Sequence, residues 1–188
     1  MPRRVRSGPV KQVREGHDCY EQVRDIVTRR LAAAPRTRAE LAVDLIERGA
    51  PSPVIDAVLD RFEELGLVDD LAFARTFVEV GHRVRGHARR LMRRDLIRRG
   101  VAEDLVEEAL LTIDDDAEEQ RARDVARQRI KIRPGEDPRR ALSRLAGQLA
   151  RRGYSPRTCF DAAREALANV PGGVPSSVTD EISEQILM

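Results

Sequence analysis

The feature that most constrains this 188-residue chain is an internal repeat of about fifty residues. Three segments share one layout, in which a Leu is followed four positions later by a Gly: 45–49, 96–100 and 149–153. The three glycines lie 51 and 53 residues apart. A second apolar residue stands eight positions before each Gly, namely Leu41, Met92 and Leu145. Because side chains four apart share one face of an α-helix, each segment predicts the end of an amphipathic helix.

Signals for a further helix surround each of these segments. The repeat glycine suits the left-handed residue that closes a helix, and Ser52-Pro53 and Ser155-Pro156 then fit the N-cap and first position of the next. Another stretch with helical spacing precedes each pair, over residues 19–34, 70–84 and 116–131. No segment alternates with period two, so no sheet is expected. The predicted fold is all-α: nine helices as three tandem three-helix, helix-turn-helix-like repeats in an elongated, curved array.

Breaker residues divide the chain further. Pro and Gly are scattered with charge through the first seventeen residues, and Val-Pro-Gly-Gly-Val-Pro-Ser-Ser occupies 170–177. The expected organisation is a disordered basic arm over residues 1–17, three-helix repeats over 18–67, 68–113 and 114–169, and a flexible C-terminal tail over 170–188.

Composition argues against catalysis, a cofactor and a membrane. Neither lysine, Lys11 or Lys131, follows a glycine, so there is no phosphate-binding Gly-x-x-x-x-Gly-Lys loop, and no nucleophile elbow occurs. Cys19 and Cys159 are isolated, with no spacing for a disulfide framework or metal quartet. No run approaches the roughly 18 apolar residues that span a bilayer. We expect a cytoplasmic protein that is not an enzyme and uses no cofactor.

Three fragments, in order, resemble the RecX family. Residues 66–78, Gly-Leu-Val-Asp-Asp-Leu-Ala-Phe-Ala-Arg-Thr-Phe-Val, are similar to its Gly-hydrophobic-Asp-Asp stretch followed by Phe-Ala and an aromatic-Val. Residues 37–41, Thr-Arg-Ala-Glu-Leu, resemble its Ser/Thr-Arg-x-Glu-Leu, and 149–154 resemble its late Leu-x-x-Arg-Gly-Phe/Tyr. The resemblance covers about residues 20–167. The chain departs from the family at Arg85-Gly86-His87, where a Gly-x-Gly-like opening is typical.

The resemblance implies a function and a partner. RecX proteins modulate, and usually inhibit, RecA filament assembly, ATP hydrolysis and strand exchange, and they are thought to lie in the filament's helical groove. The chain is thus expected to act as a monomeric negative modulator that binds RecA and its nucleoprotein filament, with weak or filament-dependent contact with single-stranded DNA.

The second middle helix carries an unusual charge pattern. From Arg83 to Arg99 there are eight arginines and one acid, Asp95. Where this repeat has Arg90, Arg93 and Arg94, the other repeats have Ala, Val, Ser or Gly, so no shared requirement of the fold explains those charges. A merely solvated face would mix signs. The predicted ridge, for an acidic RecA surface or for DNA phosphates, comprises Arg83, Arg85, Arg89, Arg90, Arg93, Arg94 and Arg98.

An acidic block follows the ridge. Nine acids and no base lie between Ala102 and Glu119, and some of them favour helix N-termini through the helix dipole. Next to the ridge they make a dipolar surface that could bridge two copies of one partner, and they would repel DNA. The candidate acidic partner surface comprises Glu107, Glu108, Asp114, Asp115 and Asp116.

Two other readings are weighed against this one. A helix-turn-helix DNA-binding regulator would use similar three-helix units, but the ridge offers almost no Asn, Gln or Ser to read base edges. A metal site at Asp69 and Asp70 competes with a helix-cap role, which is favoured because a helix follows directly. His82 and His87 lack a third ligand nearby, so no zinc site is expected.

Overall fold

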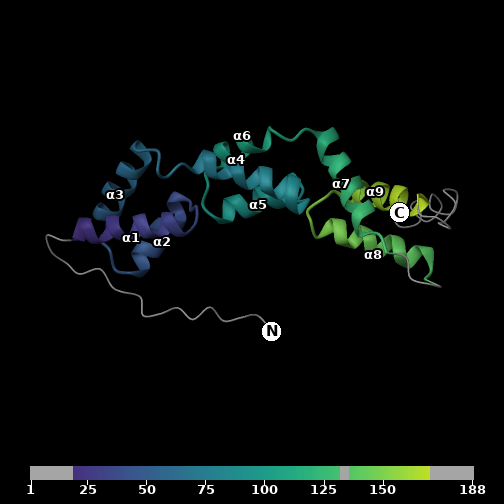
Figure 1. Ribbon diagram of the computed structural model, residues 1–188, viewed down its shortest axis with the longest axis horizontal. Coiled ribbons are helices and arrows are strands. Elements are labelled where there is room, and N and C mark those ends of the chain that lie inside the picture. The colour runs from purple at the N-terminus through teal and green to yellow at the C-terminus, as the bar shows by residue number, and fades with distance from the viewer. Residues whose placement is uncertain (1–18, 132–135, 170–188) are drawn as a thin grey trace. The chain divides into compact units, whose positions relative to one another are not determined.

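The computed structural model describes residues 19–131 and 136–169. Within these ranges the regular structure consists of nine α-helices and one π-helical turn, without a β-strand (Figure 1). The predicted all-α repeat array is therefore confirmed. The predicted basic arm, residues 1–17, and the predicted C-terminal tail, residues 170–188, lie outside the described residues.

The helices follow the expected order along the chain. Their bounds are α1 (Cys19–Ala33), α2 (Arg38–Glu47), α3 (Ser52–Glu64), α4 (Asp70–Val80), the π-helical turn (Gly81–Arg85), α5 (Arg89–Arg98), α6 (Glu103–Leu110), α7 (Asp115–Arg129), α8 (Pro138–Ala150) and α9 (Pro156–Ala168). Sequence periodicity extended the fourth helix to residue 84, whereas the α-helix ends at Val80 and a π-helical turn follows.

The chain's contacts divide it into two compact units. The first contains the described residues up to Ala74 together with Leu96–Leu105, and the second contains Arg75–Asp95 and the described residues from Val106 onward. This division does not coincide with the three repeats inferred from the sequence, whose boundaries remain a prediction. Each unit has its own hydrophobic core.

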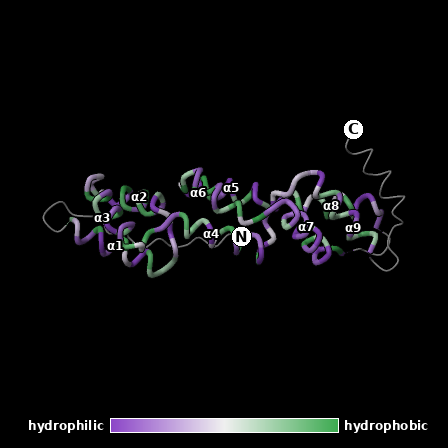
Figure 2. The backbone as a smooth tube through the Cα atoms, turned by 90° about the horizontal axis from the view of Figure 1, so that it is seen from above, coloured by the Kyte–Doolittle hydropathy of each residue, from purple (hydrophilic) through white to green (hydrophobic). Residues whose placement is uncertain are grey.

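The core of the first unit is built from α1, α2 and α3. Leu41 and Leu45, the residues eight and four positions before the first repeat glycine, are 1% exposed and pack with Val58 and Leu59. The predicted helical face is thus confirmed. Burying one such leucine stabilises the fold by about 2 kcal/mol. Figure 2 shows hydrophobic and hydrophilic segments alternating along the helices.

A polar triad supports that core. Asp44 accepts hydrogen bonds from Arg30 at 2.7 and 2.9 Å and from Arg48, four residues on, at 3.0 Å. Burial alone would raise the pKa of Asp44, but the hydrogen bonds from Arg48 and Arg30 and their charges bring it below its ordinary value. The triad ties α1 to α2.

The core of the second unit is built mainly from small side chains. Helices α7, α8 and α9 pack closely, and Ala122, Ala141, Ala162 and Ala163 are among its buried residues (Figure 1). Leu142, Leu145 and Leu149 fill the space between the helices. Small residues let the helix backbones approach each other, which suits a chain with only 3% aromatic residues.

Most of the predicted helix ends are also confirmed. Ser52, predicted as the N-cap of α3, is instead the first residue of that helix, and Pro51 is an N-cap without a side-chain hydrogen bond. Thr37 and Glu40 form a reciprocal capping box at the start of α2, and Ser155 caps α9 by accepting from the Thr158 N–H at 3.1 Å. The repeat glycines Gly49, Gly100 and Gly153 have φ values of +78°, +79° and +93°. These left-handed conformations favour glycine and explain why it recurs at the end of each middle helix.

Candidate partner-binding surface

Two junctions of the same kind position the candidate surface. In the first unit the Thr37 hydroxyl, at the start of α2, donates to the Arg99 carbonyl at 2.7 Å. In the second unit the Ala88 N–H, at the start of α5, donates to the Arg152 carbonyl at 2.9 Å. Thr37 and Ala88 each precede a repeat glycine by twelve residues, and Arg99 and Arg152 each immediately precede one. The repeat in the sequence is therefore also a repeat in packing.

Both junctions need a glycine because there is no space for a side chain at that position. A Cβ on Gly100 would lie 2.3 Å from the Cβ of Ala39, and one on Gly153 would lie 2.6 Å from the Cβ and 2.9 Å from the backbone nitrogen of Leu91. Each glycine turn is thus seated directly on the first turn of the preceding repeat's middle helix.

The second junction is held by additional hydrogen bonds to the π-helical turn and the residue that follows it. Arg121 of α7 donates to the carbonyls of His82 at 2.9 Å and Arg83 at 2.7 Å. The buried Tyr154 hydroxyl donates to the Gly86 carbonyl at 3.2 Å. Burial raises the pKa of Tyr154 to about 12, so the phenol remains a proton donor at neutral pH.

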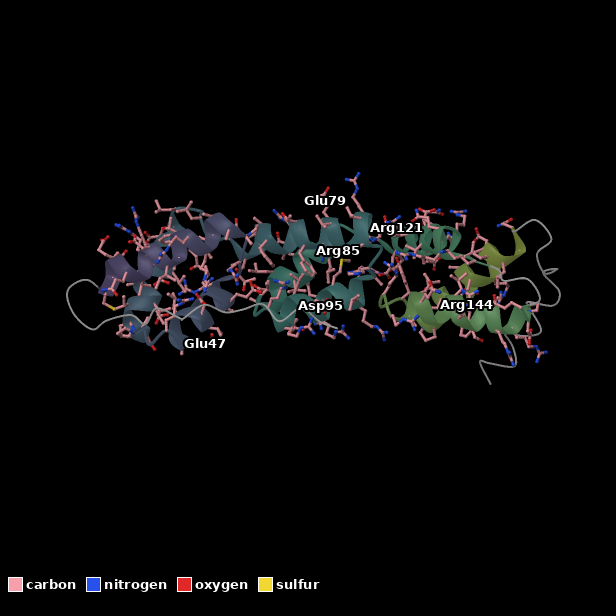
Figure 3. All side chains as sticks on the ribbon, turned by 60° about the horizontal axis from the view of Figure 1, so that its bottom comes forward. Glu47, Glu79, Arg85, Asp95, Arg121 and Arg144 are labelled. Atoms are coloured by element: carbon pink, nitrogen blue, oxygen red, sulfur yellow. The ribbon has the colours of Figure 1, made fainter. Side chains whose placement is uncertain are left out.

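A cationic groove lies at this second junction. It measures about 560 Å³ and is lined by Arg90, Leu91 and Arg94 of α5 and by Ala150, Arg151 and Gly153 from the end of α8 and its turn. Within the described part of the chain, Arg90 and Arg151 have no ion-pair partner, and Arg94 has only a 3.5 Å contact with the neighbouring Asp95. Nitrogen-tipped side chains line α5 near Asp95 (Figure 3). We call Arg90, Arg94 and Arg151 the arginine triad.

The first junction provides an internal control for the triad. At the positions equivalent to Arg90 and Arg94 it has Ala39 and Val43, and at the position of Arg151 it has Arg98. Val43 is 55% exposed, so the first junction presents an apolar side chain where the second presents Arg94. The first junction forms without arginines at these two positions. The packing of a junction therefore does not require Arg90 and Arg94.

Arg89 and Arg93 of the predicted ridge pair with acids of α6 and α7. The Arg89 guanidinium pairs with Asp115 and Glu118, and its backbone N–H donates to Glu118 at 2.6 Å. Arg93 donates to Glu107 at 2.5 Å. Burial alone would lower the pKa of Arg89, but these carboxylates raise it. Arg89, predicted as part of a ridge that meets a partner, is instead half-buried and links α5 to α7.

The other three predicted arginines are exposed. Arg83 pairs with Glu79 at 3.1 Å, and both side chains are largely in solvent. Arg85 belongs to the π-helical turn, and its carbonyl accepts a hydrogen bond from Arg152. Arg98 lies at the last position of α5, within the first unit.

Most of the predicted acidic surface is engaged within the chain. Glu107 pairs with Arg93, Glu108 pairs with Arg75 at 2.7 Å, and Asp115 pairs with Arg89. Asp114 caps α7 by accepting from the Ala117 N–H at 2.7 Å. Of these five acids, Asp116 alone has no hydrogen bond or ion pair in the described residues. Much of the acidic block therefore balances charges of α4 and α5.

Comparisons with known proteins agree with this architecture. Models of the first and second RecX three-helix domains match residues 24–62 and 69–110. The regulatory protein RecX of Streptomyces coelicolor is 43% identical over 150 residues, which cover 80% of each chain. That of Thermobifida fusca is 42% identical over 170 residues, covering 89% of this chain and 92% of the relative. The chain belongs to the RecX family.

A solved RecX structure supports the fold of this RecX-family chain. The crystal structure of RecX from Lactobacillus salivarius superposes with a TM-score of 0.68 at 16% identity, covering 78% of this chain and 96% of the other. The family is one of regulatory proteins, so a RecX regulatory role is supported for the chain.

The remaining candidates of this RecX-family chain have structural surroundings. Asp69 accepts from the Ala72 N–H at 2.8 Å, which confirms the predicted cap of α4, and Asp70 accepts from the Arg38 N–H at 2.9 Å. Burial raises the pKa of Asp70. Burial also lowers the pKa of His82 and His87, and nearby arginine charges lower it further.

The described ranges contain neither a metal-binding cluster nor a membrane-spanning helix. No set of three or more His, Cys, Asp or Glu side chains there could hold a metal ion. None of the helices in the same ranges is long and apolar enough to cross a membrane.

Sequence reasoning missed Arg151. The second repeat has an arginine, Arg98, at the equivalent position. A comparison of the repeats therefore does not single out Arg151 as a candidate for partner binding. It joins Arg90 and Arg94 only because the turn after α8 seats on α5.

Proposed function

We propose that this RecX-family chain is a negative modulator of the RecA recombinase. It binds in the groove of the RecA–single-stranded DNA filament and limits filament assembly, ATP hydrolysis and strand exchange. The proposal combines the family's regulatory role with the arginine triad, the one observation on the molecule's surface that carries it. The chain acts by binding and has no catalytic step of its own.

The triad supports binding to a partner because its charge serves no evident purpose within the chain. Neighbouring Arg89 and Arg93 are neutralised by acids, whereas Arg90 and Arg151 have no such partner in the described residues. Arginine presents a planar fork that matches carboxylates and phosphates. We therefore assign the contact with the filament first to Arg90, Arg94 and Arg151, with exposed Arg83, Arg85 and Arg98 adding long-range attraction.

RecA-dependent ATP hydrolysis on single-stranded DNA, titrated with this protein, tests the proposal. The wild-type chain should inhibit hydrolysis, and the double variant R90A/R94A should need about thirtyfold more protein, since each interfacial arginine contributes about 1 kcal/mol. The control is R139A/R140A, which removes two exposed arginines of α8 that do not line the groove.

Three results would contradict the proposal. Undisturbed hydrolysis with the protein in excess would show that the chain does not regulate RecA. Equal inhibition by wild type and R90A/R94A at physiological salt would show that Arg90 and Arg94 do not contribute to binding the filament. Sequence-preferring binding to naked duplex, without RecA, would favour a helix-turn-helix DNA-binding regulator instead.

A further inference from the structure

The arginine triad is a concentration of positive charge within one groove. The residues that line this groove include three arginines and no acid, with Leu91 and Ala150 as apolar neighbours. Arg90 and Arg151 have no ion pair in the described ranges. A ligand that fits must therefore bring several negative charges in a short span, together with some apolar surface.

The chain itself contains one segment of that chemistry. After Arg164 the sequence has no Lys or Arg up to Met188. Within this basic-free stretch, residues 180–187 read Asp-Glu-Ile-Ser-Glu-Gln-Ile-Leu, with three acids and three aliphatic residues. Residues 1–18, by contrast, contain five basic residues against two acids, which disfavours them in a cationic groove.

From these observations we infer that the acidic segment 180–187 docks into the groove of the arginine triad of the same chain. Asp180, Glu181 and Glu184 pair with Arg90, Arg94 and Arg151, and the aliphatic residues cover Leu91 and Ala150. The docking does not depend on what the protein regulates, whereas its consequence for RecA rests on the proposed function.

The length of chain between α9 and the segment allows this docking. Helix α9 begins at Pro156, three residues after groove-lining Gly153, and its 13 residues extend about 20 Å before the helix ends at Ala168. The 12 residues from Ala168 to Asp180 can span up to about 40 Å when extended. The segment can therefore return along the length of α9 to the groove.

Tethering compensates for the weakness of exposed ion pairs. Pairs of this kind are individually weak and are screened by salt. A short covalent connection, however, provides an effective concentration in the millimolar range, so a millimolar intrinsic affinity suffices to fill the groove about half of the time. The docking should consequently be partial, rapid and sensitive to ionic strength.

Docking would make the segment a competitor for the chain's partner. An acidic surface of RecA and the segment would use the same three guanidinium groups. Neutralising the segment with D180N/E181Q/E184Q should then strengthen inhibition of RecA-dependent ATP hydrolysis about twofold, because a half-filled groove becomes fully available.

A spin label on the full-length chain tests the docking without RecA. A nitroxide is attached at Q185C; Cys159 is buried and its thiol pKa is raised to about 11, and Cys19 is also buried, so both react poorly. We expect broadened amide NMR signals at Leu91, Arg94, Arg151 and Gly153. The broadening should fall at least threefold in 0.5 M salt, in D180N/E181Q/E184Q and in R90A/R94A, and persist in R139A/R140A.

Several outcomes would overturn the inference. Unbroadened amides around the groove would exclude docking, and broadening that survives D180N/E181Q/E184Q would exclude recognition by charge. A mixture of isotope-labelled chain with separately spin-labelled chain distinguishes the two sources of the segment: broadening of equal size in that mixture would assign it to a neighbouring copy. Because RecA is absent, each result stands apart from the test of the proposed function.

Discussion

The two repeat junctions share the contact between a helix start and a glycine turn, and they differ in side chains that are exposed beside it. In the first unit the helix start contacts the next glycine turn through the Thr37 hydroxyl, and the surface beside it carries Val43. In the second unit the contact uses the Ala88 N–H, and the equivalent surface carries Arg94. The contacts that pack one repeat against the next are shared by both junctions. The exposed side chains beside them differ, and these are available to bind a partner.

Substituting the three repeat glycines tests the shared part of the comparison, with the largest expected effect. G153A should lower the free energy of unfolding by about 3 kcal/mol, because its methyl group would meet both the Cβ and the backbone of Leu91. G100A meets only the Ala39 side chain closely and should cost about 2 kcal/mol. Urea denaturation of the variants measures this order.

Gly49 is the matched control for those substitutions. It has the same left-handed backbone, but within the described residues a Cβ there would have no neighbour within 4 Å. G49A should therefore cost about 1 kcal/mol, the conformational penalty alone. Equal losses at all three glycines would mean that the turns do not seat on the neighbouring helices, and the equivalence of the junctions would be lost.

Removing the Thr37 hydroxyl tests the difference between the junctions. T37A should destabilise the protein by about 2 kcal/mol, since the buried hydroxyl both caps α2 and donates to the Arg99 carbonyl. The exposed Thr28, whose hydroxyl bonds only within its own helix, provides the control: T28A should change stability by less than about 0.5 kcal/mol. Thermal or urea unfolding that cannot distinguish T37A from T28A would show that the first junction does not depend on its side chain.

The sequence predicted the fold well because its signals are local. Spacing of Leu41 and Leu45 indicated a buried helical face, and Ser, Pro and Gly marked the ends of helices. The site was only partly predictable. The exposure of Arg90 and Arg94 follows from the helical period, but Arg89 and Arg93 find acids 14 to 29 residues away, which depends on how helices pack. Arg151 enters the groove through tertiary structure alone.

A pH titration probes the second junction, which has two half-buried histidines where the first has none. Burial lowers the folded-state pKa of His82 and His87 below the ordinary 6.5. The unfolded chain therefore binds protons first as the pH falls below about 6.5, and stability should decrease from there until the folded-state pKa values are passed. Urea midpoints between pH 7.5 and 5 measure the decrease, and H82Q/H87Q should flatten it. A wild-type midpoint that is constant over this range would show that the histidines are not desolvated in solution.

The smallest effect on stability is expected for the arginines of α5, and it separates the ridge into two classes. R93A removes an exposed ion pair with Glu107 and should cost at most about 1 kcal/mol, whereas R90A removes a side chain with no ion pair in the described residues and should cost almost nothing. In the RecA-dependent ATPase titration the order should reverse, with R90A weakening inhibition more than R93A does. Since Arg93 is already balanced within the chain and Arg90 is not, each substitution serves as the control for the other. If R93A weakened inhibition as much as R90A, charge on α5 would act as a whole, and the contrast between the two junctions would no longer identify the residues that meet the partner.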